Sequence, residues 1–333
     1  MSEGALRTLL FLFCLEFYSN LEYYKNIHYR PLEVIRLNLK HIVNEADSNK
    51  TVKQILKGRL GISERFLKKL KYNNRIYLNS MPVYVNAIAS TGDMIEAFID
   101  FDEEESDTEP ENIPIDIIYE DECMIVLNKQ PGIVVHPTFN HPSGTIANAV
   151  AFHMLKSGIV KKIRPVSRLD RDTTGIIIFA KNEYVQESLI RQMNEKTLVK
   201  EYVGVVSGIV SEKAGKIVLP ISRKPDSIML RHVSEDGDQS VTHFECLEQL
   251  TDATLLRFIL ETGRTHQIRV HCQAIGHPLV GDTLYSDIKS DSISRQALHS
   301  HRIQLRHPFS GELMEFSAPL PKDIKELLEI LRK

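Results

Sequence analysis

Cysteine, long apolar segments and nucleotide-binding motifs are scarce or missing in this chain, and each absence argues against a class of protein. The 333 residues include four cysteines and no C-x-x-C pair, which argues against a disulfide framework or a zinc finger and suits a reducing cytoplasm. The apolar run at 9–15 is far shorter than the roughly 20 residues that span a bilayer, so no transmembrane helix is expected. No G-x-x-x-x-G-K-[ST] loop and no convincing G-x-G-x-x-G is present, so no nucleotide cofactor is expected.

Net charge is also small, at −3, and gives no global sign of a nucleic-acid partner, but the charge is segregated along the chain. Residues 50–75 contain nine Lys or Arg and one acid, whereas residues 100–111 contain eight acids and no base. Apolar spacing predicts two short helices in the basic segment, the second capped by Ser63. The basic side chains left on the outer face are Arg59, Arg65, Lys68, Lys69 and Lys71. The acidic segment is typical of a self-repelling linker.

The segment RLDRDTTGIIIFAKN, at 168–182, sets two carboxylates and two arginines directly before an apolar run. The run at 176–179 predicts a buried strand, so Asp170 and Asp172 should lie on a loop at the entrance of that strand. Such a loop can present a catalytic carboxylate. Arg-Asp alternation in a turn is equally common in surface ion-pair clusters, so these residues alone leave both interpretations open.

The rest of this half of the chain alternates between strand and helix patterns. Helices are expected to begin at Thr145, Asn182, Thr265 and Pro321, and strands at 123–127, 198–206, 241–250 and 254–261. Long antiparallel stretches with segregated helices indicate the α+β class.

Several blocks resemble, in the same order, the motifs of the RluA-type pseudouridine synthases. They are KQPGIVVHP at 129–137, SRLDRDTTG at 167–175, KEYVGVVSG at 200–208 and ETGRTHQIRVHCQAIGHPLVGD at 261–282. The resemblance covers roughly residues 113–320. It implies a curved mixed, largely antiparallel sheet with flanking helices.

Residues 40–103 resemble the alpha-L RNA-binding module, which is named for a small-subunit ribosomal protein. The expected organisation is therefore a leader of uncertain status at 1–39, the small RNA-binding domain at 40–103, an acidic linker at 104–112 and the catalytic domain at 113–333.

The resemblance implies an RNA pseudouridine synthase, an isomerase that detaches uracil from its ribose, rotates it and rejoins it through a ring carbon. The family's essential aspartate falls on Asp170, acting as nucleophile or base. Its tyrosine falls on Tyr202, which could stack on the uracil and relay a proton. Its basic partner falls on Arg269, for which we expect bidentate pairing with Asp170. This chemistry requires no cofactor and no metal.

Arg168, Arg171, Arg264 and His266 are further candidates for RNA contact, besides the five basic residues of the helices. The target uridine must be flipped out of its stack, at a cost of a few kcal/mol. The alpha-L resemblance favours ribosomal RNA over transfer RNA by analogy. We expect a monomer that acts in the cytoplasm and does not bind a membrane.

Two rival functions remain at this stage. Histidines gather in two groups, His136, His141 and His153, then His299, His301 and His307, as a metal-dependent hydrolase would require. However, no H-E-x-x-H pairing is present. A non-catalytic RNA-binding or ribosome-assembly protein on the same fold would be marked by loss of Asp170, Tyr202 or Arg269, and the chain retains all three.

Overall fold

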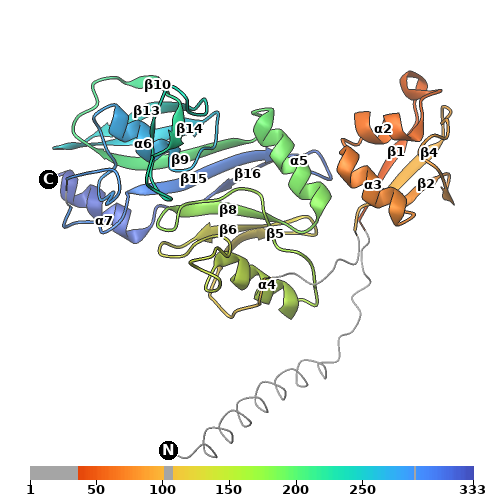
Figure 1. The fold of residues 1–333 in the computed structure, drawn as a ribbon, viewed down its shortest axis with the longest axis horizontal. Helices are drawn as coiled ribbons and strands as arrows, with labels where there is room; N and C mark the ends of the chain where they lie inside the picture. The colour runs from red at the N-terminus through yellow and green to blue at the C-terminus, as the bar shows by residue number, and fades with distance from the viewer. Residues whose placement is uncertain (1–36, 101–107, 289) are drawn as a thin grey trace, which may run out of the picture. The chain divides into compact units, whose positions relative to one another are not determined.

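The computed structural model describes residues 37–100, 108–288 and 290–333 (Figure 1). The expected leader up to residue 36, and residues 104–107 of the expected linker, lie outside this description. Within the described ranges, no helix is both long enough and apolar enough to cross a bilayer.

Residues 37–100 form a small antiparallel sheet with two helices. The strand order is β1 (Asn38–Ile42), β4 (Met94–Phe98), β2 (Ile76–Leu78) and β3 (Met81–Pro82). The short turn η1 (Glu45–Asp47) precedes helices α2 (Val52–Gly58) and α3 (Glu64–Tyr72). Strand β1 begins two residues ahead of the expected start of this domain, and Leu39 within it is buried.

Local signals in the sequence account for these elements. Ser63 caps α3, since its Oγ accepts a hydrogen bond from the Phe66 backbone N at 3.0 Å. Asn79 and Ser80 have φ of 49° and 65°, as the tight turn between β2 and β3 requires. The two helices predicted for this segment are therefore confirmed, and β2 and β3 form a hairpin after them.

Residues 108–333 are built on a mixed ten-stranded sheet, with eight strands in the main order and two attached to it. The main order is β10 (Ala214–Val218), β13 (Val241–Gln249), β14 (Ala253–Leu260), β9 (Val199–Ser207), β15 (Leu298–Arg306), β8 (Thr174–Ala180), β6 (Met124–Lys129) and β5 (Asp116–Glu120). Strand β16 (Leu313–Ser317) pairs with β15, and β7 (Arg164–Pro165) with β8. Among the described strands only β8 and β15 pair in parallel, so the predicted mixed, largely antiparallel sheet is confirmed.

Helices cover both faces of this sheet (Figure 1). They are α4 (Ile146–Lys156), α5 (Glu183–Asn194), α6 (Gln267–Ala274) and α7 (Lys322–Leu331). Successive side chains of a strand point to opposite faces, so Ile177 of β8 packs in the cluster that includes α4 and α6, whereas Ile178 packs with α5. On β9, Tyr202 faces the α4 and α6 side and Val203 faces α7.

Helix α6 starts later than expected. It begins at Gln267, not at Thr265, because His266 takes the left-handed conformation with φ of 58° and directly precedes the helix. A non-glycine residue in this region is uncommon and costs free energy, so surrounding contacts must hold it there.

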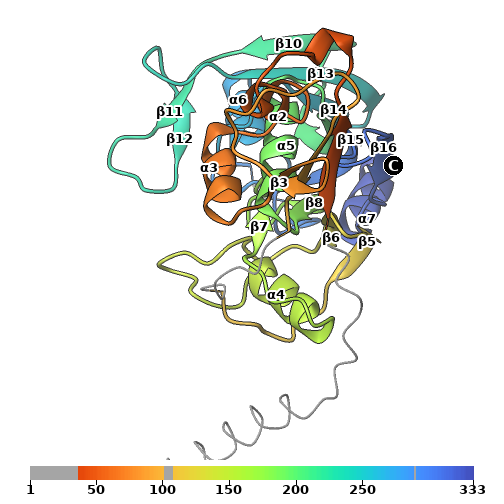
Figure 2. The ribbon, with the colours of Figure 1, turned by 90° about the vertical axis from the view of Figure 1, so that its right-hand side faces the viewer.

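A separate two-stranded ribbon of β11 (Ile221–Arg223) and β12 (Arg231–Val233) follows β10 in the chain. It projects away from the main sheet in Figure 2.

Candidate active site

The loop before β8 and the first turn of α6 bring together Asp170 and Arg269, which are 99 positions apart in the chain. Arg269 Nη1 donates to Asp170 Oδ2 at 3.1 Å. The Asp170 side chain is 23 % exposed, whereas that of Arg269 is 5 % exposed. The arrangement is a carboxylate with one oxygen held by a buried cation and part of its surface open to a reactant.

The bidentate pairing expected between Arg269 and Asp170 is wrong, because the fork of the guanidinium pairs with Asp282. Arg269 Nε and Nη2 donate to the two carboxylate oxygens of Asp282, each at 2.7 Å, and the Asp282 side chain is fully buried. Burial opposes the charge of Arg269, but the two carboxylates outweigh it and raise the pKa of the guanidinium above its ordinary value. Asp282 therefore orients the guanidinium, and the third nitrogen of Arg269, Nη1, is left to donate to Asp170.

Sequence reasoning missed Asp282, although the segment HPLVGD that contains it belongs to the blocks carrying the resemblance. Its neighbour Gly281 has φ of 74°, and a Cβ there would lie 2.3 Å from the Arg295 carbonyl oxygen. Only glycine fits this approach, so the Gly-Asp pair was an available signal.

His266 completes the surroundings of Asp170. Its Nε2 lies 3.8 Å from Asp170 Oδ1, and its Nδ1 lies 2.8 Å from the hydroxyl of Tyr285. Burial lowers the pKa of His266, and the charge of Asp170 counteracts part of this effect. The residue expected to contact RNA therefore also lies against the candidate carboxylate.

Tyr202 stands on β9 on the same side of the sheet as α6. It is 7 % exposed and packs in one buried cluster with Ile268 and Cys272 of that helix. Burial, together with the charge of Asp170, raises the pKa of Tyr202 to about 12. The hydroxyl is therefore protonated at neutral pH, as a proton relay requires.

Lys129, at the end of β6, is a second buried cation that sequence reasoning missed. It is 1 % exposed, and its Nζ donates to the backbone carbonyls of Gln130, Arg171 and Thr173 at 2.9, 2.7 and 2.9 Å. Burial lowers the pKa of Lys129 to about 7, opposed first by the charge of Asp172. A lysine at the end of a largely apolar strand was the signal. The side chain fixes the backbone of the loop that follows Asp170.

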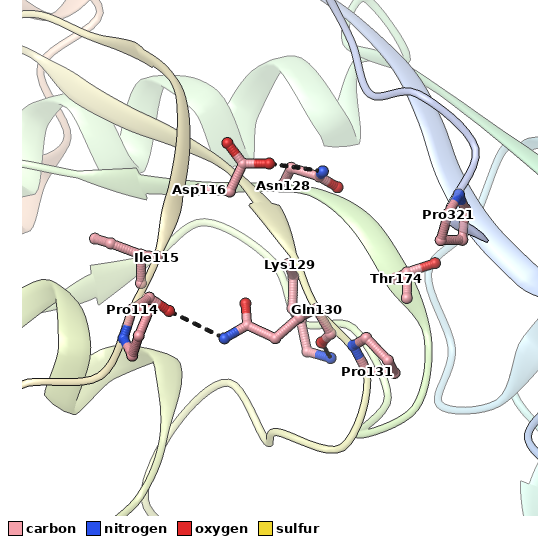
Figure 3. A pocket seen from close by; sticks show the side chains of 9 residues that line it. All are labelled: Pro114, Ile115, Asp116, Asn128, Lys129, Gln130, Pro131, Thr174 and Pro321. Carbon is pink, nitrogen blue, oxygen red and sulfur yellow. Dashed lines mark hydrogen bonds between the residues drawn. The ribbon is translucent and has the colours of Figure 1, made fainter. Parts of the chain in front are cut away.

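Lys129 also borders a cavity of about 390 Å³ between the start of β5, the end of β6 and Pro321 (Figure 3). Asp170, Tyr202 and Arg269 are not among its lining residues. A second cavity, of about 520 Å³, lies at the base of the β11–β12 ribbon, and its charged lining residues are Arg223, Arg231, Arg264, Asp236 and Asp238. This second cavity adjoins the residues just before His266.

The four candidate RNA contacts near the loop have different surroundings. Arg168 is exposed, and Arg171 pairs with Asp172 through an Nη2 to Oδ2 distance of 2.9 Å. Arg264 lies 3.3 Å from Asp238, and its side chain is 44 % exposed. These arginines are accessible to a ligand, whereas His266 is mostly buried.

The basic residues of α2 and α3 divide into paired and outward groups. The paired residues are Arg59, which donates to Asp47, and Arg65 and Lys69, which both contact Glu183. Lys68 and Lys71 are exposed on α3. The expected basic face is therefore reduced in part by internal ion pairs.

Three of the six histidines of the rival metal hypothesis contact other side chains. His153 contacts Glu120 at 2.7 Å, His299 contacts Thr174 Oγ1 at 2.9 Å and His307 contacts Asp121 at 2.9 Å. In the described part of the chain one group could reach a common ion, formed by Asp121, Cys123 and His307. The two carboxylate oxygens of Asp121 already accept hydrogen bonds from the Tyr119 hydroxyl, from His307 and from two backbone N atoms.

Comparison with known proteins identifies the family. The model of the RNA pseudouridylate synthase family matches residues 123–274. The chain is 42 % identical to the uncharacterized RNA pseudouridine synthase YjbO of Bacillus subtilis, over 84 % of this chain and 98 % of that protein. It is 39 % identical to ribosomal large subunit pseudouridine synthase D of Pasteurella multocida, over 78 % of this chain and 84 % of that protein.

Solved structures show the same fold. Human RNA pseudouridylate synthase domain containing 4 aligns with a TM-score of 0.55 at 22 % identity, covering 65 % of this chain and 93 % of its own. Human RNA pseudouridylate synthase domain containing 1 aligns with a TM-score of 0.52 at 24 % identity, covering 69 % of this chain and 97 % of its own.

The chain belongs to the RluA-type RNA pseudouridine synthases. It is therefore an isomerase that converts uridine in RNA to pseudouridine, as the sequence predicted.

Proposed function

We propose that Asp170 is the catalytic carboxylate, that Arg269 holds it ionised and oriented, and that Tyr202 contacts the uracil and relays a proton. The observation that supports this best is the contact at 3.1 Å between the buried Arg269 and the partly exposed Asp170. A carboxylate can act as a nucleophile or a base only if it is charged, accessible and fixed in direction. Asp282 fixes the orientation of Arg269, because its carboxylate accepts hydrogen bonds from two nitrogen atoms of the guanidinium. Arg269 in turn holds the Asp170 carboxylate in one direction.

We further propose that the substrate is ribosomal RNA and that residues 37–100 act as an alpha-L-type module that attracts phosphates. A relative with 39 % identity is named for the large ribosomal subunit, which supports this choice. Lys68 and Lys71 are among the exposed cations of α3, and Arg264 with its neighbours Arg223 and Arg231 offers a second group of basic side chains. Such contacts position RNA without reading its sequence. We also propose that the protein acts as a monomer in the cytoplasm.

Asp170→Asn tests the assignment of the carboxylate. The amide is almost isosteric but is neither a nucleophile nor a base, so pseudouridine formation should cease while folding and RNA affinity are retained. Asp172→Asn is the matched control, because the Asp172 carboxylate contacts Arg171 on the surface. Tyr202→Phe removes one hydroxyl and should lose most turnover.

Conversion of a uridine-labelled RNA should be measured for all three variants beside melting curves and binding isotherms. Retention of a tenth of wild-type turnover by Asp170→Asn would rule out Asp170 as the catalytic carboxylate. The RNA itself is identified by mapping pseudouridines in total RNA from cells with and without the protein. A site missing from transfer RNA, with ribosomal RNA unchanged, would contradict the proposed substrate.

A further inference from the structure

A second buried arginine outside the site described above contacts the loop that carries Asp170. Arg295 is 7 % exposed and precedes β15. Its Nη1 donates to the carbonyl oxygens of Asp172 at 3.0 Å and Gln296 at 3.1 Å. Its Nε and Nη2 donate to the two carboxylate oxygens of Asp323 at 2.7 and 2.8 Å. One planar guanidinium therefore links the loop to the first turn of α7.

Arg295 and Lys129 together hold three consecutive carbonyl groups of this loop. Lys129 Nζ binds the carbonyls of Arg171 and Thr173, and Arg295 Nη1 binds the carbonyl of Asp172 between them. The guanidinium of Arg295 carries a charge at all ordinary pH values, and hydrogen bonds from a charged donor are roughly twice as strong as neutral ones. The carbonyl groups of the three residues that directly follow Asp170 are thus held by two buried basic side chains, irrespective of the side chains that the loop carries.

We propose that Arg295 is a positioning residue for catalysis, which acts with Asp323 to hold the Asp170 carboxylate against Arg269. The proposal rests on the proposed role of Asp170. A displacement of about 1 Å in a reacting group can cost roughly 100-fold in rate. Loss of the Arg295 contacts should therefore lower kcat at least tenfold, while RNA affinity stays within about twofold of the wild type, because Arg295 contacts no reacting atom.

The test compares Arg295→Met with Leu328→Ala in the full chain. Leu328 lies on α7, is 3 % exposed and packs in the cluster under this helix, so its truncation loosens α7 without removing a loop contact. Turnover at saturating RNA, RNA affinity, melting temperature and amide hydrogen exchange of residues 170–174 should be measured for both. We expect similar losses of melting temperature, but a large fall in kcat and faster exchange in this segment only for Arg295→Met. Arg295→Lys should recover part of the turnover.

Equal kcat for the two variants at equal loss of melting temperature would overturn the proposal, as would a weakened RNA affinity that explains the whole loss. If Arg295→Met does not fold, Asp323→Asn replaces it, since it keeps the arginine and removes only its charged partner. A severalfold lower kcat with unchanged affinity then supports the proposal, and wild-type kcat refutes it.

Asp170→Asn, assayed beside these variants, distinguishes failure of the proposed catalytic role of Asp170 from failure of the proposed positioning role of Arg295. If it is inactive while Arg295→Met turns over normally, only the positioning role fails. If it is active, the proposed catalytic function fails first.

Discussion

Asp282→Asn should lower both stability and turnover, although Asp282 is buried and is not expected to contact the substrate. The carboxylate accepts two hydrogen bonds from Arg269 at 2.7 Å and is fully buried. Removing one partner of a buried ion pair costs about 3–5 kcal/mol, and we expect the lower end because Asp170 still faces the arginine. At about 2–4 °C per kcal/mol, this corresponds to a fall in melting temperature of roughly 6–12 °C.

The catalytic consequence follows from the same contacts. Without a matching acceptor for its fork, Arg269 can turn toward Asp170, which shifts the direction of the catalytic carboxylate. A shift of about 1 Å is worth roughly 100-fold in rate, so turnover should fall by one to two orders of magnitude. Urea denaturation gives the stability change, and single-turnover conversion of a labelled RNA at saturating enzyme gives the rate.

Asp47→Asn is the control for this experiment. Asp47 accepts two hydrogen bonds from Arg59 within residues 37–100, so its loss removes a comparable carboxylate and arginine pair away from the site. The control should lose stability and keep its single-turnover rate. If Asp282→Asn turns over at more than half the wild-type rate under conditions where it is folded, the orientation of Arg269 does not depend on Asp282.

Three further predictions follow from the described elements. A chain that begins at Leu37 should keep its stability and activity, whereas one that begins at Lys40 loses the pairs of residues 38 and 39 with β4 and should melt earlier; equal melting temperatures would contradict this. Replacing Lys68 and Lys71 together by Gln should reduce the slope of log affinity against log salt by up to about 1.4–1.8, depending on whether the RNA they contact is single- or double-stranded, and an unchanged slope would show that this face does not meet RNA. Burial lowers the pKa of His299 to about 4, so the unfolded chain takes up a proton at higher pH than the folded chain, and stability should fall from pH of about 6.5 toward 4; urea titrations should show a smaller slope in His299→Gln than in the wild type, and an unchanged slope would contradict this.

Local patterns predicted the elements of this fold well, and the site less completely. The caps at Ser63 and Thr145 and the apolar run of β8 are short-range signals, so they marked helices and a strand correctly. The contacts that hold the loop join residues far apart, such as Lys129 to Arg171 over 42 positions and Arg295 to Asp172 over 123. Periodicity carries no information about such pairs.

The resemblance supplied Asp170 and Arg269 but not the geometry between them. Whether the fork of Arg269 would face Asp170 or another carboxylate depends on how α6 sits against the segment that contains Asp282. The left-handed residue His266 directly precedes that helix, and positive φ is too uncommon in a non-glycine residue, even in histidine, to be predicted from the sequence.

The position of β15 in the sheet has a consequence for synthesis of the protein on the ribosome. This strand lies between β8 and β9 in the main strand order. It therefore joins the part of the sheet next to the Asp170 loop to the part that carries Tyr202. Until residues 298–306 have left the exit tunnel, the nascent chain holds two partial sheets whose unpaired edges are β8 and β9. Such edges are templates for aggregation. Activity should therefore arise late and abruptly during translation, and the incomplete chain should depend on chaperones.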